Sequence, residues 1–167
     1  MAPATEQTLA EIDGMLMRQT AGQFATGVTV VTYEHEGENF GATVNSFTSV
    51  SLDPPLVLVS MMNSSRAAQK LGDRPFTVNI LRHDQHAVAM QFAGKPLDPD
   101  AVEWVDDSAA PRLGGTVGHF VCEPWEIYPG GDHVLVVGRV VSVGSEPGHA
   151  LTFHQGRFGN TAELAAA

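Results

Sequence analysis

Short runs of β-branched and aliphatic residues, separated by turn residues, recur along most of this chain. Runs of this kind, bounded by Gly, Pro, Asn or Asp, are typical of β-strands. The strands predicted in this way cover residues 28–33, 40–46, 49–52, 56–62, 76–81, 117–127, 133–143 and a last short piece at 151–158. Glu36-Gly37-Glu38-Asn39 and Pro129-Gly130-Gly131 are the clearest turns between them.

Three segments have helical spacing instead. Apolar residues between Thr8 and Phe24 recur at about one helical turn, although two glycines within that segment weaken the pattern. A short helix at 66–71 can be capped by the serines before it, and another is predicted at 84–92. Residues 94–116 are rich in Pro, Gly and Asp and are predicted to form one long loop, a feature that often carries function.

Sequential strands with little helix between them argue against a parallel sheet of βαβ units. A small, closed, antiparallel barrel suits the pattern better, because closure removes exposed strand edges. The length of 167 residues suits a single domain. We therefore expect a disordered tail at 1–7, one domain at 8–160 and a second tail at 161–167.

Charge and cysteine content narrow the functional classes. The net charge of −10 argues against nucleic acid or an anionic membrane as a partner. Cys122 is the one cysteine, so an intrachain disulfide is impossible, and its apolar neighbours predict an inert buried thiol. No stretch has the length of a membrane span, and the N-terminus lacks a signal-peptide pattern, so a cytoplasmic protein is expected.

The reagents of common enzymes are also missing from the sequence. It has no G-x-G-x-x-G fingerprint after a strand, no phosphate-binding P-loop, no G-x-S-x-G elbow and no zinc-binding cysteine cluster. His83 and His86 could share a helical face, but no third metal ligand accompanies them, so no metal site is predicted. If the chain is an enzyme, a cofactor should supply the chemistry.

The most unusual segment is 41–55, where small polar side chains gather between two predicted core strands. Its hydrogen-bonding side chains are Thr43, Asn45, Ser46, Thr48, Ser49, Ser51 and Asp53. A core avoids such groups, because each buried and unpaired one costs about 1–3 kcal/mol. The composition of this segment leaves two interpretations open: a solvated turn, or a surface that faces a polar ligand.

Six segments, in this order, resemble the flavin reductase family with the FMN-binding split-barrel fold, the reductase components of two-component flavin-dependent monooxygenases. They are FATGVTVVT (24–32), TVNSFTSVSLDPPLVL (43–58), FTVNIL (76–81), FAG (92–94), GDH (131–133) with VGRV (137–140), and FHQGRF (153–158). Together they span nearly the whole chain. The resemblance implies a mainly β, Greek-key antiparallel split β-barrel with a few short helices, paired as a homodimer.

The resemblance also implies where FMN or FAD would bind. The positions that match the family's cofactor contacts are Thr43, Val44, Asn45, Ser46, Phe47, Ser49, Val50, Ser60, Met61, Ser64, Ser65, Phe92, Ala93 and Gly94. The Ser/Thr/Asn-rich stretch suits the polar edge of an isoalloxazine and a phosphate. His133 matches the residue associated with NADH or NADPH, which gives it the catalytic assignment, and Phe158 falls near that site.

The implied activity is an NAD(P)H:flavin oxidoreductase that supplies reduced flavin to a partner monooxygenase. Hydride transfer from the nicotinamide to the flavin needs no protein acid or base, which agrees with the missing catalytic motifs. Backbone N–H groups near 43–46 would stabilise the negative charge that develops on the flavin. Two alternatives share the fold: a protein that holds flavin tightly as an electron carrier or sensor, and a reductase that acts directly on a non-flavin substrate.

Overall fold

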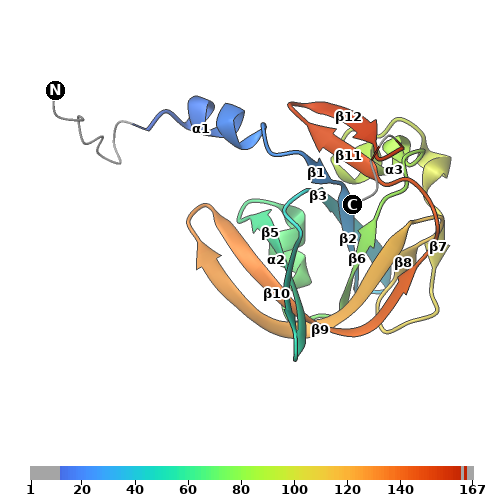
Figure 1. Cartoon of the computed structure of the whole chain (residues 1–167). Helices are drawn as coiled ribbons and strands as arrows, with labels where there is room; N and C mark the ends of the chain where they lie inside the picture. The colour runs from blue at the N-terminus through green and yellow to red at the C-terminus, as the bar shows by residue number, and fades with distance from the viewer. Residues whose placement is uncertain (1–11, 163, 165–167) are drawn as a thin grey trace, which may run out of the picture.

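A computed structural model describes residues 12–162 and 164 of the chain. It is mainly β, and Figure 1 shows a strongly curved sheet with helices inside it and above it. The strands are β1 (Thr26–Gly27), β2 (Thr29–His35), β3 (Glu38–Val44), β4 (Thr48–Leu52), β5 (Pro55–Met62), β6 (Phe76–Ile80), β7 (Trp104–Val105), β8 (Arg112–Leu113), β9 (Gly118–Gly130), β10 (His133–Ser145), β11 (Leu151–His154) and β12 (Arg157–Asn160).

Seven of these strands form one antiparallel sheet in the order β3-β2-β6-β9-β10-β5-β4. Strands far apart in the chain are neighbours in it, such as β2 with β6 and β10 with β5. Its two edge strands, β3 and β4, are consecutive in sequence and are joined by residues 45–47, where the barrel is split. The predicted Greek-key antiparallel split barrel is confirmed.

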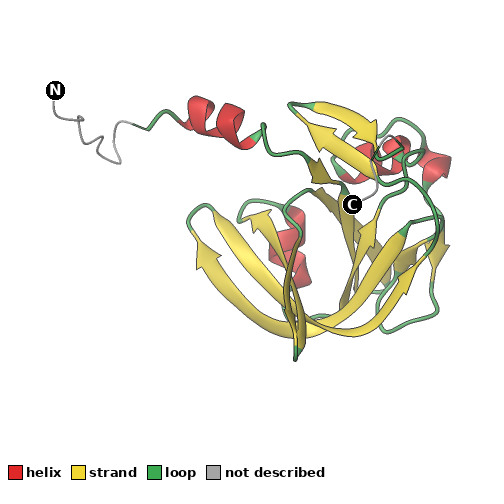
Figure 2. Cartoon of the chain, viewed as in Figure 1, coloured by secondary structure: helices red, strands yellow, loops and turns green. Residues whose placement is uncertain are grey.

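The core of the barrel forms where β2 and β6 place buried side chains opposite β5, β9 and β10. Residues 29–33 of β2 are all buried, so this strand shows no alternation between core and solvent. Helix α2 (Arg66–Leu71) lies inside the curve of the sheet and buries Ala67 and Leu71 there (Figure 2). A second cluster of buried residues lies between β11, β8 and α3 (His86–Phe92).

The helix predicted between Thr8 and Phe24 is shorter in the structure. Helix α1 spans Gly14–Ala21 and begins where the Asp13 carboxylate accepts a hydrogen bond from the Met15 N–H. Residues 8–11 lie outside the described residues, as does the predicted tail at 1–7. None of the α1 residues is buried, and in Figure 1 the helix stands away from the barrel.

The segment 94–116 is not the featureless loop that its composition predicts. It contains a 3₁₀ turn at Pro99–Ala101 and the two-stranded β7–β8 ladder. Buried Asn79 on β6 anchors it: the side-chain oxygen accepts from Leu113 N–H at 2.8 Å, and the amide nitrogen donates to Thr32 Oγ1 at 2.9 Å. These bonds satisfy a polar side chain that is 0% exposed, and they fix the segment against the barrel.

Candidate functional site

A cavity of about 430 Å³ opens where the end of β3, the end of β5, the end of α3 and the start of β10 meet. Its lining residues are Ala42, Thr43, Val44, Asn45, Ser46, Ser60, Met61, Met62, Ser65, Phe92, Ala93 and His133. All of these except Ala42 and Met62 were predicted as cofactor contacts from the sequence. The structure therefore brings together four chain segments that the sequence could only name one by one.

Two of the predicted polar residues use their hydroxyl groups in hydrogen bonds to other parts of the protein. Ser46 Oγ donates to Ser60 O at 2.8 Å and accepts from Ser60 N at 2.9 Å. Thr43 Oγ1 donates to Ala89 O at 2.7 Å, which ties β3 to α3. These side chains shape the wall of the cavity, whereas Asn45 is exposed beside them. The polar segment 41–55 is thus neither a simple solvated turn nor a row of free ligand contacts.

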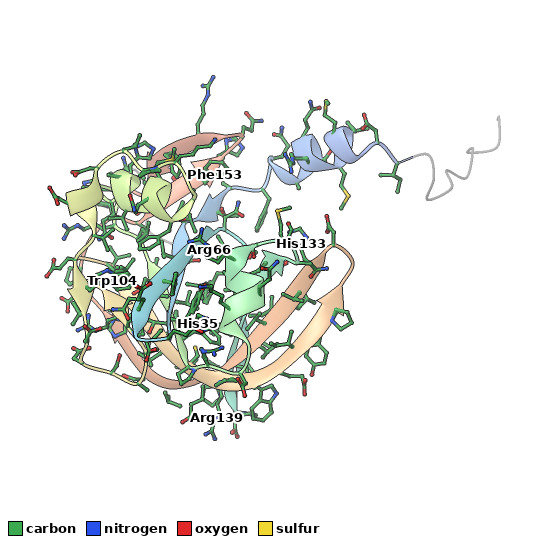
Figure 3. The ribbon with its side chains drawn as sticks, turned by 180° about the vertical axis from the view of Figure 1, so that it is seen from behind. His35, Arg66, Trp104, His133, Arg139 and Phe153 are labelled. Atoms are coloured by element: carbon green, nitrogen blue, oxygen red, sulfur yellow. The ribbon has the colours of Figure 1, made fainter. Side chains whose placement is uncertain are left out.

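The opposite wall joins the end of β5 to the β9–β10 turn. Asn63, just after β5, donates its backbone N–H to Asp132 O at 2.9 Å and its side-chain amide to Gly131 O at 3.1 Å. His133 follows this turn and lies opposite Met62 in the β5–β10 ladder. In Figure 3 it lies at the start of β10, and Arg66 lies at the start of α2.

His133 is half-buried, and its Nδ1 lies 2.7 Å from Asp132 Oδ1. The hydrogen bond from His133 holds the pKa of the Asp132 carboxyl below its usual value, and the charge of the ring adds to the same effect. With Nδ1 facing the carboxylate, Nε2 is the ring nitrogen left for a ligand. Asp132 does not line the cavity itself, but its contact with Nδ1 helps to orient the His133 ring at the cavity wall.

The third wall depends on a glycine. A Cβ placed at Gly41 would lie 2.7 Å from Cδ1 of Phe92, so only glycine lets that ring pack against β3. Phe92 also packs edge-on against Trp104, with ring centroids 5.8 Å apart. These two contacts hold the end of α3 in place, and there Phe92 and Ala93 line the cavity.

The remaining predicted residues lie outside this cavity. Phe47 stacks on Phe120 with centroids 5.4 Å apart, and Phe158 on β12 packs against His86 and Phe153. The others are exposed, namely Ser49 and Val50 on β4, Ser64 before α2, and Gly94 after α3 with a φ of +75°. The structure does not join these six to the cavity wall.

A larger cavity of about 880 Å³ adjoins the first, between α1 and the β11–β12 hairpin. Asn45 lines both cavities. The sequence prediction missed the rest of this lining, although the FATG and FHQGRF segments that flank it belong to the resemblance. A lining drawn from both ends of the chain is visible only once the fold brings them together.

Other chemistry finds little support. Among the described residues, no group of three or more His, Cys, Asp or Glu side chains could hold a metal ion. Burial raises the pKa of the Cys122 thiol to about 12, so it stays protonated and unreactive, as its apolar neighbours predict. In the part of the chain that the structure describes, no helix is long and apolar enough to cross a membrane.

Comparison with known proteins identifies the family of this curved split barrel, whose cavity has both polar and apolar walls. Residues 21–162 match the flavin reductase like domain. The chain belongs to this family, which confirms the resemblance found in the sequence.

Three relatives show what kinds of protein the chain is similar to. It is 41% identical over 152 residues to an NADH-dependent flavin reductase of a Rhodococcus species, covering 89% of this chain and 86% of that protein. It is 34% identical over 166 residues, 95% of this chain and 86% of the relative, to the reductase component of a 4-nitrophenol 4-monooxygenase/4-nitrocatechol 2-monooxygenase from Rhodococcus opacus. The solved structure of an NADH:FAD oxidoreductase of Streptomyces globisporus, in complex with NAD and FAD fragments, superposes with a TM-score of 0.83 at 39% identity, covering 92% and 96% of the two chains.

Proposed function

We propose that this protein is an NAD(P)H-dependent flavin reductase that supplies reduced flavin to a partner monooxygenase. The observation that carries the proposal is the cavity at Asn45, Ser60, Phe92 and His133, in a chain of the flavin reductase family. Its relatives include NADH-dependent flavin reductases and reductase components of monooxygenases. NADH is therefore the first nicotinamide cofactor to test, with FMN and FAD as the flavins.

The residues of the cavity fit an isoalloxazine. Such a ring is flat, with one polar edge and one apolar edge. Val44, Met61 and Phe92 offer apolar contacts, whereas Asn45 and the backbone of 43–46 offer polar ones. The hydroxyls of Ser64 and Ser65, next to Arg66, provide groups that suit a phosphate. Ser65 also caps α2 through Ala68 N–H at 3.1 Å, which fixes its position.

A bound flavin would supply the acceptor for a hydride from the reduced nicotinamide. The chain itself has three tasks: to hold the flavin, to orient the nicotinamide and to restrict the access of water to the cavity. His133, held by Asp132, orients the nicotinamide nucleotide at the rim of the cavity. The Ser46–Ser60 and Thr43–Ala89 bonds keep the wall rigid, so that the bound rings keep a reactive separation.

We further propose that the protein is a cytoplasmic homodimer. The outer half of β9, beyond Cys122, pairs on one side only among the described strands, because its β6 pairing ends there. Trp125, Ile127 and Tyr128 on that half are exposed. An open strand edge that carries large apolar side chains is usually covered by a partner. A second copy of this chain would cover the open edge of β9.

Steady-state assays of the purified protein test the function. The protein is incubated with NADH or NADPH and with FMN, FAD or riboflavin, and nicotinamide oxidation is followed. We expect NADH oxidation that depends on added flavin, and hydroxylation by an added flavin-dependent monooxygenase component that rises with the reduced flavin supplied. Flavin that stays bound through gel filtration and shows no turnover with either nicotinamide would refute the proposal and indicate an electron carrier or sensor.

A further inference from the structure

Three cations gather along helix α2, beside the candidate flavin cavity. Arg66, Lys70 and Arg74 follow one another at intervals of four residues, so they lie along one side of the helix and at its C-terminal end. We propose that this basic stripe guides phosphorylated flavins into the cavity electrostatically and thereby favours them over riboflavin. The proposal rests on the proposed function and deepens it, because it says how the same site selects among flavins.

The stripe stands out in a chain of this charge. The chain has 9 Lys and Arg residues against 19 Asp and Glu, and its net charge is −10. Three of the nine cations fall between residues 66 and 74, where Asp73 is the only acidic residue. The molecule as a whole repels a ligand that carries a phosphate. A local cluster of cations therefore decides from which side such a ligand approaches.

The cations of the stripe are not neutralised by carboxylates. Among the described residues, three other arginines each have a carboxylate oxygen 2.6–2.8 Å away. No ion pair in this part of the chain involves Arg66, Lys70 or Arg74. The field of the stripe is therefore not cancelled by a bonded partner.

Contacts within the protein hold these charges in place. Lys70 Nζ lies 4.3 Å from the centre of the Phe40 ring, and Arg74 Nη1 donates to Lys70 O at 2.7 Å. Burial raises the pKa of Tyr33, and the charges of Arg66 and Arg74 oppose that rise. Both guanidiniums thus lie close enough to the Tyr33 hydroxyl to act on it. The stripe is a positioned set of charges along one side of α2.

The stripe begins at the cavity. Ser65, the residue before Arg66, lines the cavity and caps α2 with its hydroxyl. Lys70 lies about 6 Å further along the helix axis. Figure 3 shows Arg66 and His133 at the same end of the barrel. Because α2 lies inside the curve of the sheet, a small anion reaches the stripe more readily than the surface of another protein does (Figure 2).

The size of the effect follows from Coulomb's law. At about 0.01 M salt, where the Debye length is about 30 Å, one unit charge about 10 Å from a doubly charged phosphate changes an association rate about two- to threefold. At about 1 M salt the Debye length falls to about 3 Å, and the effect disappears. Riboflavin has the same isoalloxazine ring but no phosphate, so its association should depend on neither the stripe nor the salt.

The test compares FMN with riboflavin. Stopped-flow flavin fluorescence gives the association and dissociation rate constants of both ligands at the two salt concentrations. They are measured for the wild type, for Lys70→Gln and for Lys70→Arg, which keeps the charge. Arg139→Gln is the matched control, because it removes one positive charge from β10 at the other end of the barrel (Figure 3).

We expect Lys70→Gln to lower the association rate constant of FMN about two- to threefold at low salt. The dissociation rate constant of FMN and both constants of riboflavin should not change. Lys70→Arg and Arg139→Gln should match the wild type, and all variants should coincide at high salt. An unchanged FMN association rate in Lys70→Gln, an equal effect on riboflavin, an effect confined to dissociation, or an equal loss in Arg139→Gln would overturn the proposal.

The two proposals fail in different ways, because these rate constants are measured without a nicotinamide. A protein that binds FMN at a rate that depends on Lys70, but oxidises neither NADH nor NADPH, would lose the reductase function and keep the role of the stripe. A protein that oxidises NADH with FMN, but whose FMN association does not depend on Lys70, would keep the function and lose the stripe. Failure to bind FMN at all would remove both.

Discussion

Replacing Ser46 by alanine should destabilise the protein more than any replacement of an exposed serine in the same polar segment. In the β5–β10 ladder Ser60 lies opposite Leu135, and its N–H and C=O both bond to Ser46 Oγ on the other side of β5. The β4 pairing ends at Thr48 and Leu58, so no β4 residue stands beside Ser60. The Ser46 hydroxyl therefore bonds to the two backbone groups of Ser60 that a neighbouring strand would otherwise pair with, at the point where the barrel is split.

The magnitude follows from the groups left unpaired. Ser46→Ala removes two hydrogen bonds and leaves a half-buried N–H and C=O without partners. Each such group costs about 1–3 kcal/mol when fully buried, and access to water lowers the figure here. We therefore expect a loss of about 2 kcal/mol, equivalent to roughly 4–8 °C in Tm for a chain of this size.

Chemical denaturation followed by tryptophan fluorescence measures the free energy of unfolding directly. Ser49→Ala is the control, since Ser49 is an exposed serine of the same segment, and its change should stay within about 0.5 kcal/mol. The flavin dissociation constant should rise in Ser46→Ala, because the wall at 45–47 loses its anchor to β5. Equal stability in the two variants would refute this account of the split.

Four further predictions concern other sites. His133→Ala should slow NADH oxidation and raise the KM for NADH while leaving flavin affinity nearly unchanged; equal losses of both would show that its assigned role is wrong. The pKa of Asp132, followed by NMR, should lie below its usual value and return to it in His133→Ala, since the hydrogen bond from the ring lowers it; an unchanged titration would contradict this cause. Cys122 should resist thiol reagents at pH 8 until the protein unfolds, because burial raises its pKa to about 12. Trp125→Glu should convert a dimer to a monomer in light scattering, and a dimer that persists would place the interface elsewhere.

The depressed pKa of Asp132 also sets the direction of a pH effect. Its folded-state pKa lies below the unfolded value, so the contribution of the pair to stability is present above the unfolded pKa. That contribution is lost as the pH falls through the folded-state pKa. Because the Asp132 side chain is 88% exposed, the Asp132–His133 contact is expected to matter for the orientation of the ring more than for stability.

Local patterns predicted several elements closely. Helix α2 spans the expected residues, because Ser65 caps it and Gly72 follows it. Strands β2, β5 and β6 begin and end within about two residues of their β-branched runs. β3, at Glu38–Val44, lies two residues earlier in the chain than predicted, because its ladder with β2 begins within the predicted turn. The ladder formed by β7 and β8 depends on long-range bonds to Asn79 that no local pattern shows.

Turn residues and β-branched runs are local features, so they were enough to predict the strand-rich architecture. The resemblance of six ordered segments to the flavin reductase family then predicted most of the residues that line the candidate flavin cavity. Which polar groups remain free for a ligand depends on the assembled fold. The Ser46 hydroxyl serves Ser60 instead, and Asn45 joins a cavity lined by residues from both ends of the chain. Hydrogen-bond satisfaction and cavity shape arise from contacts between distant segments, so they become visible only when the barrel is assembled.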